Sequence, residues 1–361
     1  MHIHKKNNEL ASPKLGTHYF WKVKNILVVG AGFAGSVIAR ELANNNFNVT
    51  IIDKRDHIGG NAYDFVNKEG IMQHMYGPHL FHTKNKTIFD YLSQYTEWIQ
   101  YKHKVKAMLS NGNLVTLPAN AETAKIVGKE NIVNTFFRPY SEKMWGLKLE
   151  EIDPDIINRI KIREDDNEYY FPDDDFQVLP KEGYTQLFKN LLDHCNINIK
   201  LNTPFLKEME DKFEHIFNSM PIDDYYNFCY GELPYRSIKF HSKELEINRI
   251  FPVSVVNFTH KEKYTRVTEW KNIPSNQNSV MAQEAITTIT FEEPCCYKEN
   301  NYERYYPVKD LAGKNRELYK KYEAIENSKV TFIGRLGLYT YLDMDQVVNS
   351  AIITAKKFLK K

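Results

Sequence analysis

The residues best suited to bind a charged ligand form a glycine-rich turn near the N-terminus, Gly30-Ala31-Gly32-Phe33-Ala34-Gly35. In a turn of this pattern the first glycine permits a tight bend, and the second lets the backbone approach a pyrophosphate. The third lets a helix pack closely on a strand. Asp53 ends the next apolar run, where a carboxylate can accept hydrogen bonds from a ribose. We interpret the pattern as a dinucleotide site; the alternative is a glycine turn that only packs.

Other side chains could do chemistry but are ambiguous on their own. His79 and His82 have the spacing of a metal-binding pair, yet no convincing further ligands lie near them in the sequence. The run Asp173-Asp174-Asp175 is typical of a solvated loop. An arginine such as Arg159 is usually a surface residue, and most of the 23 tyrosines are expected in packing roles. We therefore predict no metal site.

The elements around the glycine turn predict a parallel sheet. Residues 25–29 read as a buried strand, 36–43 as a helix and 49–53 as a second strand, which makes a right-handed β-α-β unit. Further strands are expected at 197–201, 216–218 and 329–334, and a closing helix at 344–359.

The middle of the chain reads differently. Helices are expected at 87–92, 120–126, 131–140 and 184–193, a hairpin at 105–117 and an antiparallel sheet over 236–272. The fold class is thus α/β: a dinucleotide-binding Rossmann-like domain with a helical insert and an antiparallel sheet domain. The expected division is an extension at 1–24, a discontinuous cofactor domain at 25–85, 190–222 and 328–361, a mainly helical insert at 86–162, and a sheet domain at 163–189 and 223–327.

Bulk composition excludes several function classes. The net charge of +2 gives no argument for nucleic acid, and no apolar run approaches the ~20 residues of a membrane span. The four cysteines form no CxxC pair, which fits free thiols in a reducing cytosol. The polar N-terminal residues do not form a secretory signal. We expect a cytoplasmic protein.

A second glycine pair narrows the cofactor. Gly59-Gly60 follows the acidic residue, and Phe332-Ile333-Gly334-Arg335 precedes the last helix. Both features resemble the two-dinucleotide-binding flavoproteins, and ordinary NAD dehydrogenases lack them. The expected cofactor is FAD.

Further stretches follow in chain order: Gly59-Gly60-Asn61-Ala62-Tyr63, Tyr76-Gly77-Pro78-His79-Leu80-Phe81-His82-Thr83, Tyr140-Ser141-Glu142-Lys143-Met144-Trp145-Gly146, Tyr264-Thr265-Arg266, Tyr305-Tyr306-Pro307-Val308, Gly334-Arg335-Leu336 and Tyr341-Leu342-Asp343-Met344. Together they resemble the UDP-galactopyranose mutase family. The resemblance implies redox-neutral conversion of a nucleotide sugar between pyranose and furanose forms, for surface polysaccharide synthesis. The substrate would be UDP-galactopyranose or an analogue such as UDP-GalNAc or dTDP-fucose. In that family N5 of reduced FAD attacks the anomeric carbon and expels the diphosphate, which returns after the ring recloses.

The resemblance also assigns residues. It implies catalytic roles for Arg159, on a mobile loop over 151–161, and for Arg266, His79 and His82. It implies cofactor contacts at Gly30, Gly32, Phe33, Gly35, Asp53, Lys54, Gly59, Gly60, Asn61, His79, Leu80, Arg335, Leu342, Asp343, Met344 and Val347. It implies substrate contacts at Phe136, Tyr140, Ser141, Trp145, Arg159, Tyr170, Asn257, Arg266, Glu292, Tyr306 and Tyr341.

The chain departs from the family pattern in two places. The helical insert is short, and bacterial members often dimerise through it, so a homodimer stays open. Phe291 stands where many members have an arginine, and Glu292 could be a site residue or a solvated acid. A changed neighbour there could accompany another sugar. Two alternatives remain: an FAD-dependent amine oxidase-like oxidoreductase, and a silent sugar-nucleotide-binding relative.

Overall fold

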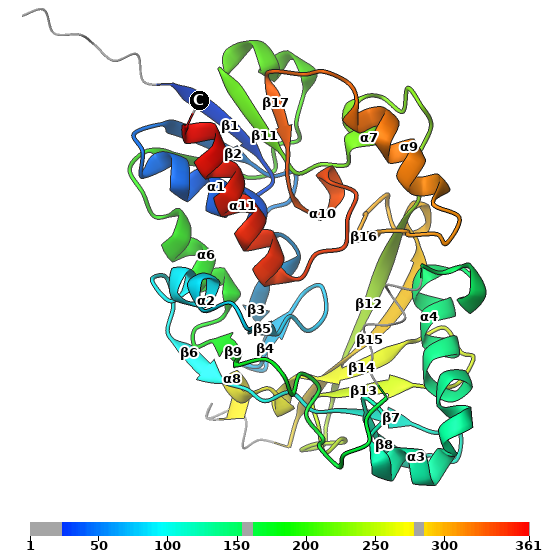
Figure 1. Ribbon diagram of the computed structural model, residues 1–361. Helices are drawn as coiled ribbons and strands as arrows, with labels where there is room; N and C mark the ends of the chain where they lie inside the picture. Colours follow the sequence, from blue (N-terminus) through cyan, green and yellow to red (C-terminus); the bar gives the residue numbers. More distant parts are fainter. Residues whose placement is uncertain (1–23, 154–161, 278–284, 361) are drawn as a thin grey trace, which may run out of the picture.

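The computed structural model describes residues 24–153, 162–277 and 285–360. A five-stranded parallel sheet lies at one end of the molecule (Figure 1). Its strand order is β10-β2-β1-β11-β17. Its strands are β1 (Asn25–Val29), β2 (Asn48–Ile52), β10 (Ile197–Lys200), β11 (His215–Asn218) and β17 (Val330–Phe332). The expected parallel strands are therefore confirmed, including the three that come from the C-terminal half of the chain.

The central strand β1 is buried on both faces. Ile26 and Val28 belong to the core that contains the helices of one face, while Leu27 and Val29 belong to a separate cluster on the other. Successive side chains in a strand point to opposite faces, so a continuous apolar run is what a strand covered on both sides requires.

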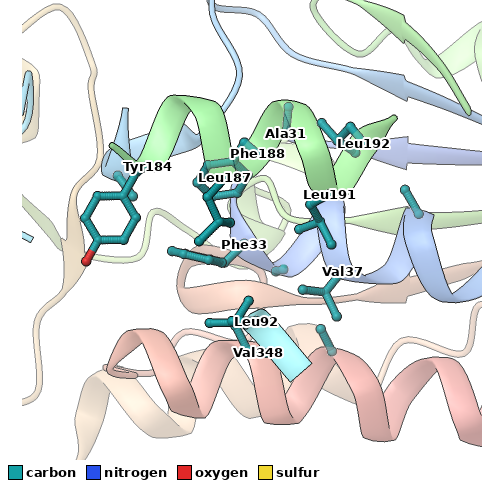
Figure 2. Close-up of a cluster of buried hydrophobic side chains, with 14 of the residues drawn as sticks. Ala31, Phe33, Val37, Leu92, Tyr184, Leu187, Phe188, Leu191, Leu192 and Val348 are labelled. Atoms are coloured by element: carbon teal, nitrogen blue, oxygen red, sulfur yellow. The ribbon is translucent and has the colours of Figure 1, made fainter. Parts of the chain in front are cut away.

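Helices α1 (Phe33–Ala43), α6 (Tyr184–Leu192) and α11 (Met344–Leu359) pack together on one face of this sheet. Figure 2 shows Phe33 and Val37 of α1 between the apolar side chains of α6 and Val348 of α11. The rings of Phe33 and Phe188 lie 4.6 Å apart between centroids. The first turn of α1, which continues from the glycine-rich turn, is thus tightly packed against the neighbouring helices.

Two boundaries differ from the expected ones. α1 begins at Phe33, three residues before the expected start, so Gly35 lies inside the helix. The expected limit between residues 189 and 190 divides α6, which packs as one helix on α1. The periodicity of the sequence alone could not locate this domain boundary, because α6 is amphipathic whichever domain it belongs to.

A seven-stranded sheet forms the other large layer, in the order β16-β12-β15-β14-β13-β7-β8. Its strands are β7 (Val105–Met108), β8 (Leu114–Leu117), β12 (Tyr235–Leu245), β13 (Val255–Phe258), β14 (Arg266–Glu269), β15 (Thr287–Cys296) and β16 (Tyr306–Pro307). All neighbours are antiparallel except β13 and β7. The expected 105–117 hairpin is thus confirmed, but it extends this sheet rather than belonging to a helical insert.

Smaller elements make up the rest of the described residues. Two short sheets contain β3 (Asp64–Val66) with β4 (Met72–His74), and β5 (Phe81–Thr83) with β9 (Phe176–Pro180) and β6 (Trp98–Gln100). The remaining helices are α2 (Lys86–Leu92), α3 (Ala121–Val127), α4 (Arg138–Trp145), α7 (Ile222–Tyr225), α8 (Pro274–Gln277), α9 (Lys314–Glu323) and α10 (Gly334–Gly337). One π-helical turn covers Val133–Phe137, and 3₁₀ turns cover Gly60–Ala62, Lys129–Asn131, Leu149–Glu151, Lys207–Lys212, Trp270–Asn272 and Tyr297–Glu299. Within the described ranges, every helix is too short or too polar to cross a membrane.

Candidate active site

The glycine turn lies where β1 meets α1. Gly30 has a φ of +99°, a conformation that favours glycine, and its amide donates a 2.8 Å hydrogen bond to the Ile52 carbonyl of β2. Gly32 is the N-cap of α1, and no described side chain caps that end of the helix. The first amides of α1 are therefore left for a ligand, and the partial positive charge of the helix end favours a phosphate there.

The second glycine turn packs on the first. The Gly59 amide donates a 2.9 Å hydrogen bond to the Ala31 carbonyl, and a Cβ added to Gly60 would lie 2.9 Å from Cα of Gly32. The two turns border a cavity of about 450 Å³, which we call the glycine-turn cavity; its volume is typical of a ligand site. Most of the predicted cofactor residues line it, namely Gly30, Gly32, Phe33, Gly35, Asp53, Lys54, Gly59, Gly60, Asn61, His79, Arg335, Leu342, Met344 and Val347.

Two predicted cofactor residues do not line this cavity. Leu80 packs against the core that α1 and α6 share. Asp343 is the N-cap of α11 and forms a capping box with Gln346, whose Oε1 accepts the Asp343 amide at 2.9 Å. Leu80 therefore has a packing role and Asp343 a capping role, although their sequence neighbours in the same motifs line the cavity.

Replacing Gly35 with alanine is expected to lower the free energy of unfolding by about 3 kcal/mol, because the added Cβ would overpack a closed contact. That Cβ would lie 1.9 Å from the Gly30 carbonyl oxygen and 2.9 Å from Cγ1 of Val28. Urea unfolding followed by circular dichroism measures the change. The matched control is Gly32→Ala, whose Cβ would meet its nearest atom at 3.5 Å. Equal midpoints for Gly35→Ala and the wild type would contradict the close packing.

Asp53 organises the turn and also lines the cavity. One carboxylate oxygen accepts the Ala31 amide and the other accepts the Arg55 amide, each at 2.9 Å. A carboxylate has more acceptor positions than these two bonds use, so Asp53 can also receive a hydroxyl from a ribose. The ribose contact itself stays a prediction.

The sequence patterns did not predict an ionic cluster that borders the glycine-turn cavity. Glu303 forms ion pairs with Lys54, at 3.2 Å, and with Arg55, and all three line the cavity. Burial acts to raise the pKa of the Glu303 carboxyl, but the charges of Arg55 and Lys54 more than offset it and leave that pKa below its ordinary value. Arg55 could have been predicted, because it follows Asp53 closely in the sequence. Glu303 could not, because it is distant in the sequence and no local pattern marks it.

The two predicted histidines have different surroundings. His79 lines the glycine-turn cavity, and its Nδ1 lies 2.9 Å from the Gly77 carbonyl oxygen. His82, next but two on the chain, turns away: its Nδ1 lies 2.7 Å from Asp174, and its ring stacks on Phe171 at 3.6 Å. Of the two histidines, His79 lines the glycine-turn cavity and His82 does not, so a cofactor contact of His82 stays a prediction. Asp174, the partner of His82, belongs to the acidic run that was expected to be a solvated loop.

Buried histidines predict a loss of stability in acid. Burial lowers the pKa of His74 and of His103 to about 3. Because histidine ordinarily titrates near 6.5, the unfolded chain binds protons between about pH 6.5 and 3 that the folded chain does not. The free energy of unfolding should fall in this window as the pH decreases, by up to about 1.4 kcal/mol per pH unit for each histidine. Urea unfolding at pH 7, 6 and 5 measures it. His103→Gln should make the fall shallower; an unchanged slope would mean that folded His103 is protonated.

A polar row crosses the seven-stranded sheet. Ala107, Asn257, Arg266, Glu292 and Phe240 are successive partners in register on β7, β13, β14, β15 and β12. Residues paired in register share one face of a sheet. The row therefore places an amide, a guanidinium and a carboxylate side by side on one surface.

Arg266 and Glu292 form the centre of this row. Nε of Arg266 lies 2.8 Å from Oε2 of Glu292, and the Glu292 side chain is 1% exposed. Both Glu292 oxygens are buried without a well-aligned hydrogen bond from any described residue. Burial raises the pKa of Glu292, and Arg266 acts against that rise; burial acts to lower the pKa of Arg266, but the Glu292 charge leaves it raised. Glu292 is thus buried, and the solvated alternative is wrong.

A second, smaller cavity of about 40 Å³ lies beside α4, and we call it the α4 pocket. Of the predicted substrate residues, Phe136, Tyr140, Ser141, Tyr170 and Asn257 line it. They come from the π-helical turn, α4, the loop before β9, and β13. The tertiary structure thus collects five side chains that are spread over the sequence.

Three other predicted substrate aromatics lie elsewhere. Trp145, Tyr306 and Tyr341 pack in a neighbouring cluster, with the rings of Trp145 and Tyr306 5.0 Å apart. The Tyr306 hydroxyl donates a hydrogen bond to the Met144 carbonyl of α4. In this arrangement Trp145 does not line the α4 pocket, and the Tyr306 hydroxyl is not available to a phosphate. Tyr305 instead lines the glycine-turn cavity, and its hydroxyl donates to the Tyr76 carbonyl at 2.7 Å.

Two further expectations concern Phe291 and Arg159. Phe291 follows Thr290 and precedes Glu292, so it points to the opposite face of β15, where it packs with Tyr264 and Phe258. The difference from the family pattern at Phe291 therefore does not change the polar row. Arg159 and most of its predicted loop lie outside the described residues, as do residues 1–23.

Comparisons with known proteins identify a family for this chain. A family model described as UDP-galactopyranose mutase matches residues 135–341, and one described as an NAD(P)-binding Rossmann-like domain matches residues 28–95. A probable UDP-galactopyranose mutase of Klebsiella pneumoniae is 35% identical over 93% of this chain and 95% of its own length. A dTDP-fucopyranose mutase of Escherichia coli is 34% identical over 94% and 99%.

The fold is also found among solved structures. A crystal structure of reduced UDP-galactopyranose mutase superposes with a TM-score of 0.70 over 94% of both chains, at 14% identity. With the family model covering more than half of the chain, and relatives above 30% identity matched nearly end to end, the chain belongs to the UDP-galactopyranose mutase family of isomerases.

Proposed function

We propose that this protein binds FAD in the glycine-turn cavity and, with the flavin reduced, interconverts the pyranose and furanose forms of a nucleotide sugar. UDP-galactopyranose is the first candidate substrate. The cavity fits a dinucleotide because it combines the uncapped N-terminus of α1, two abutting glycine turns and the Asp53 carboxylate. When bound and reduced, the flavin would supply at N5 the nucleophile for the anomeric carbon.

The polar row carries the proposal, because it begins at the α4 pocket and its arginine acts electrostatically on a residue of each cavity. Asn257 and Ala107 at one end line the α4 pocket. Burial raises the pKa of Tyr140 in that pocket, and the Arg266 charge acts against that rise. Burial lowers the pKa of His79 in the glycine-turn cavity to about 3, and the Arg266 charge acts in the same direction. Arg266 thus lies within electrostatic reach of both. A nucleotide base in the α4 pocket would place its diphosphate on this arginine and its sugar toward the other cavity.

Arg266 and Glu292 have complementary tasks in this reaction. A diphosphate that leaves and returns needs a cation, and the planar fork of arginine matches phosphate oxygens. Before substrate binds, the buried Glu292 carboxylate pairs with Arg266 and compensates its charge. When the diphosphate arrives, the guanidinium would engage phosphate oxygens, and its charge would stabilise the negative charge that develops as the bond to the sugar breaks.

The sugar and the nucleotide are the finer part of the proposal. The Klebsiella relative is named for UDP-galactopyranose and the Escherichia relative for dTDP-fucopyranose, at nearly the same identity. Because Phe291 lies away from the polar row, its replacement of arginine gives no argument for a different sugar. UDP-galactopyranose therefore leads, with UDP-GalNAc and dTDP-fucose as the analogues to compare.

The test is turnover by the dithionite-reduced holoprotein. UDP-galactose, UDP-GalNAc, UDP-arabinose and dTDP-fucose are each incubated as furanose or pyranose, and the isomers are separated by chromatography. We expect interconversion of at least one pair by the reduced protein only. If none turns over, while the oxidised protein consumes oxygen with an amine, the protein is an amine oxidase-like oxidoreductase and the proposal is wrong.

A further inference from the structure

Lys143 connects the two walls of the α4 pocket. It lies on α4, two residues after Ser141, and its ammonium donates hydrogen bonds to the carbonyls of Phe258, His260 and Tyr264 at 3.3, 3.0 and 2.7 Å. A lysine ammonium has three donors, so these carbonyls use all of them. Phe258 itself lines the pocket, and the other two belong to the loop that joins β13 to β14.

The three contacts replace water around a charge. Burial lowers the pKa of the Lys143 ammonium to about 8, because a cation that is partly removed from water loses part of its hydration. The wall formed by α4 carries Tyr140 and Ser141, and the facing wall carries Asn257. A shift of either wall would change the width of a pocket whose volume is only about 40 Å³.

Other contacts already hold each wall in the fold. Arg236 of β12 donates to the Met144 and Lys143 carbonyls at the end of α4, each at 2.9 Å. On the other side, Arg266 is held by backbone pairing with Asn257 and Glu292. Loss of the Lys143 contacts should therefore leave α4 folded and Arg266 in register, and should change mainly the distance between the walls.

We propose that Lys143 is a positioning residue for the nucleotide: by tying α4 to the β13–β14 loop, it sets the width of the α4 pocket that receives the base. This inference rests on the proposed function, because only a nucleotide sugar gives the pocket a base to bind. Lys143 acts through Tyr140, Ser141 and Asn257 and touches no reacting atom.

The experiment compares Lys143→Met with Lys125→Met in the FAD-loaded protein. Lys125 is an exposed lysine on α3 of the same region, so the control removes an equal charge without the carbonyl contacts. The probes are UDP and dTDP, measured by calorimetry on the oxidised protein. We expect Lys143→Met to weaken binding of the preferred nucleotide at least about tenfold, and to raise KM by a similar factor with kcat within about twofold. Lys125→Met should bind and turn over like the wild type.

Lys143→Gln is the second variant, since its amide keeps two of the donors. It should recover part of the lost affinity. Unchanged nucleotide affinity in Lys143→Met would overturn the inference. A fall in kcat without a rise in KM, or loss of FAD from both Lys143 variants, would overturn it as well, because either would show a role outside the pocket. If the wild type binds neither UDP nor dTDP, the proposed function fails instead.

Discussion

Arg266→Ala is expected to lower kcat about a thousandfold, the loss seen when a preorganised group that stabilises developing charge is removed. FAD should remain bound at the wild-type ratio, since Arg266 is not among the residues that line the glycine-turn cavity. Turnover of UDP-galactofuranose by the reduced protein, together with the absorbance of the bound flavin, measures both results.

The structure adds a complication that the control must address. Removing Arg266 leaves the buried Glu292 carboxylate without its cation, which costs stability. Arg266→Ala is therefore compared with Arg266→Ala/Glu292→Gln, which removes the unpaired charge. Both should be equally inactive if the arginine serves the diphosphate. Lys263→Ala, which removes an exposed cation paired with Glu293 near the same strand, should remain active. Recovery of activity in the double variant would assign the loss to Glu292 and not to Arg266.

Gly32→Val is expected to give a folded but colourless protein. The Gly32 backbone is extended, which valine tolerates, and an added Cβ would meet its nearest protein atom, Cα of Gly60, at an ordinary 3.5 Å. The side chain would instead occupy the space in front of the α1 N-terminus, where we place the pyrophosphate. FAD affinity should fall at least about a hundredfold, equivalent to about 2.7 kcal/mol.

Flavin absorbance per protein and the urea midpoint measure the two parts of this prediction. Gly32→Ala should lie between the wild type and Gly32→Val in FAD affinity, because the smaller group blocks less of the space. Gly35→Ala serves as the contrasting variant: it should lose stability because its Cβ would clash with protein and not with the ligand. A yellow Gly32→Val protein would refute the placement of the cofactor.

Local sequence patterns were sufficient to predict the elements around the glycine-turn cavity. The apolar run of β1, the glycines and Asp53 predict a strand, a turn, a helix and a second strand, and all are present. They were predictable because the interactions are short-range: Gly30 bonds to the end of β2, and Asp53 bonds to Ala31 of the same turn. The helix start was misplaced because the glycines that end the turn also begin α1.

The site residues were harder where their roles depend on distant neighbours. His79 and His82 look equivalent in the sequence, but His79 precedes β5, whereas His82 lies within it and contacts Asp174. Tyr305 and Tyr306 are adjacent, yet only Tyr305 reaches the cavity. Glu292 was ambiguous until the pairing of β14 with β15 placed it beside Arg266.

The sequence by itself therefore determined the dinucleotide turn, the parallel sheet around it and the family to which the chain belongs, because each depends on residues close together or in a fixed order. Only the tertiary structure decided that Asn257, Arg266 and Glu292 form one row, that Glu303 compensates Lys54 and Arg55, and that Lys143 joins the walls of the α4 pocket. The physical reason is that strand register and the partners of buried charges are set by packing between segments far apart in the chain, which no local pattern encodes.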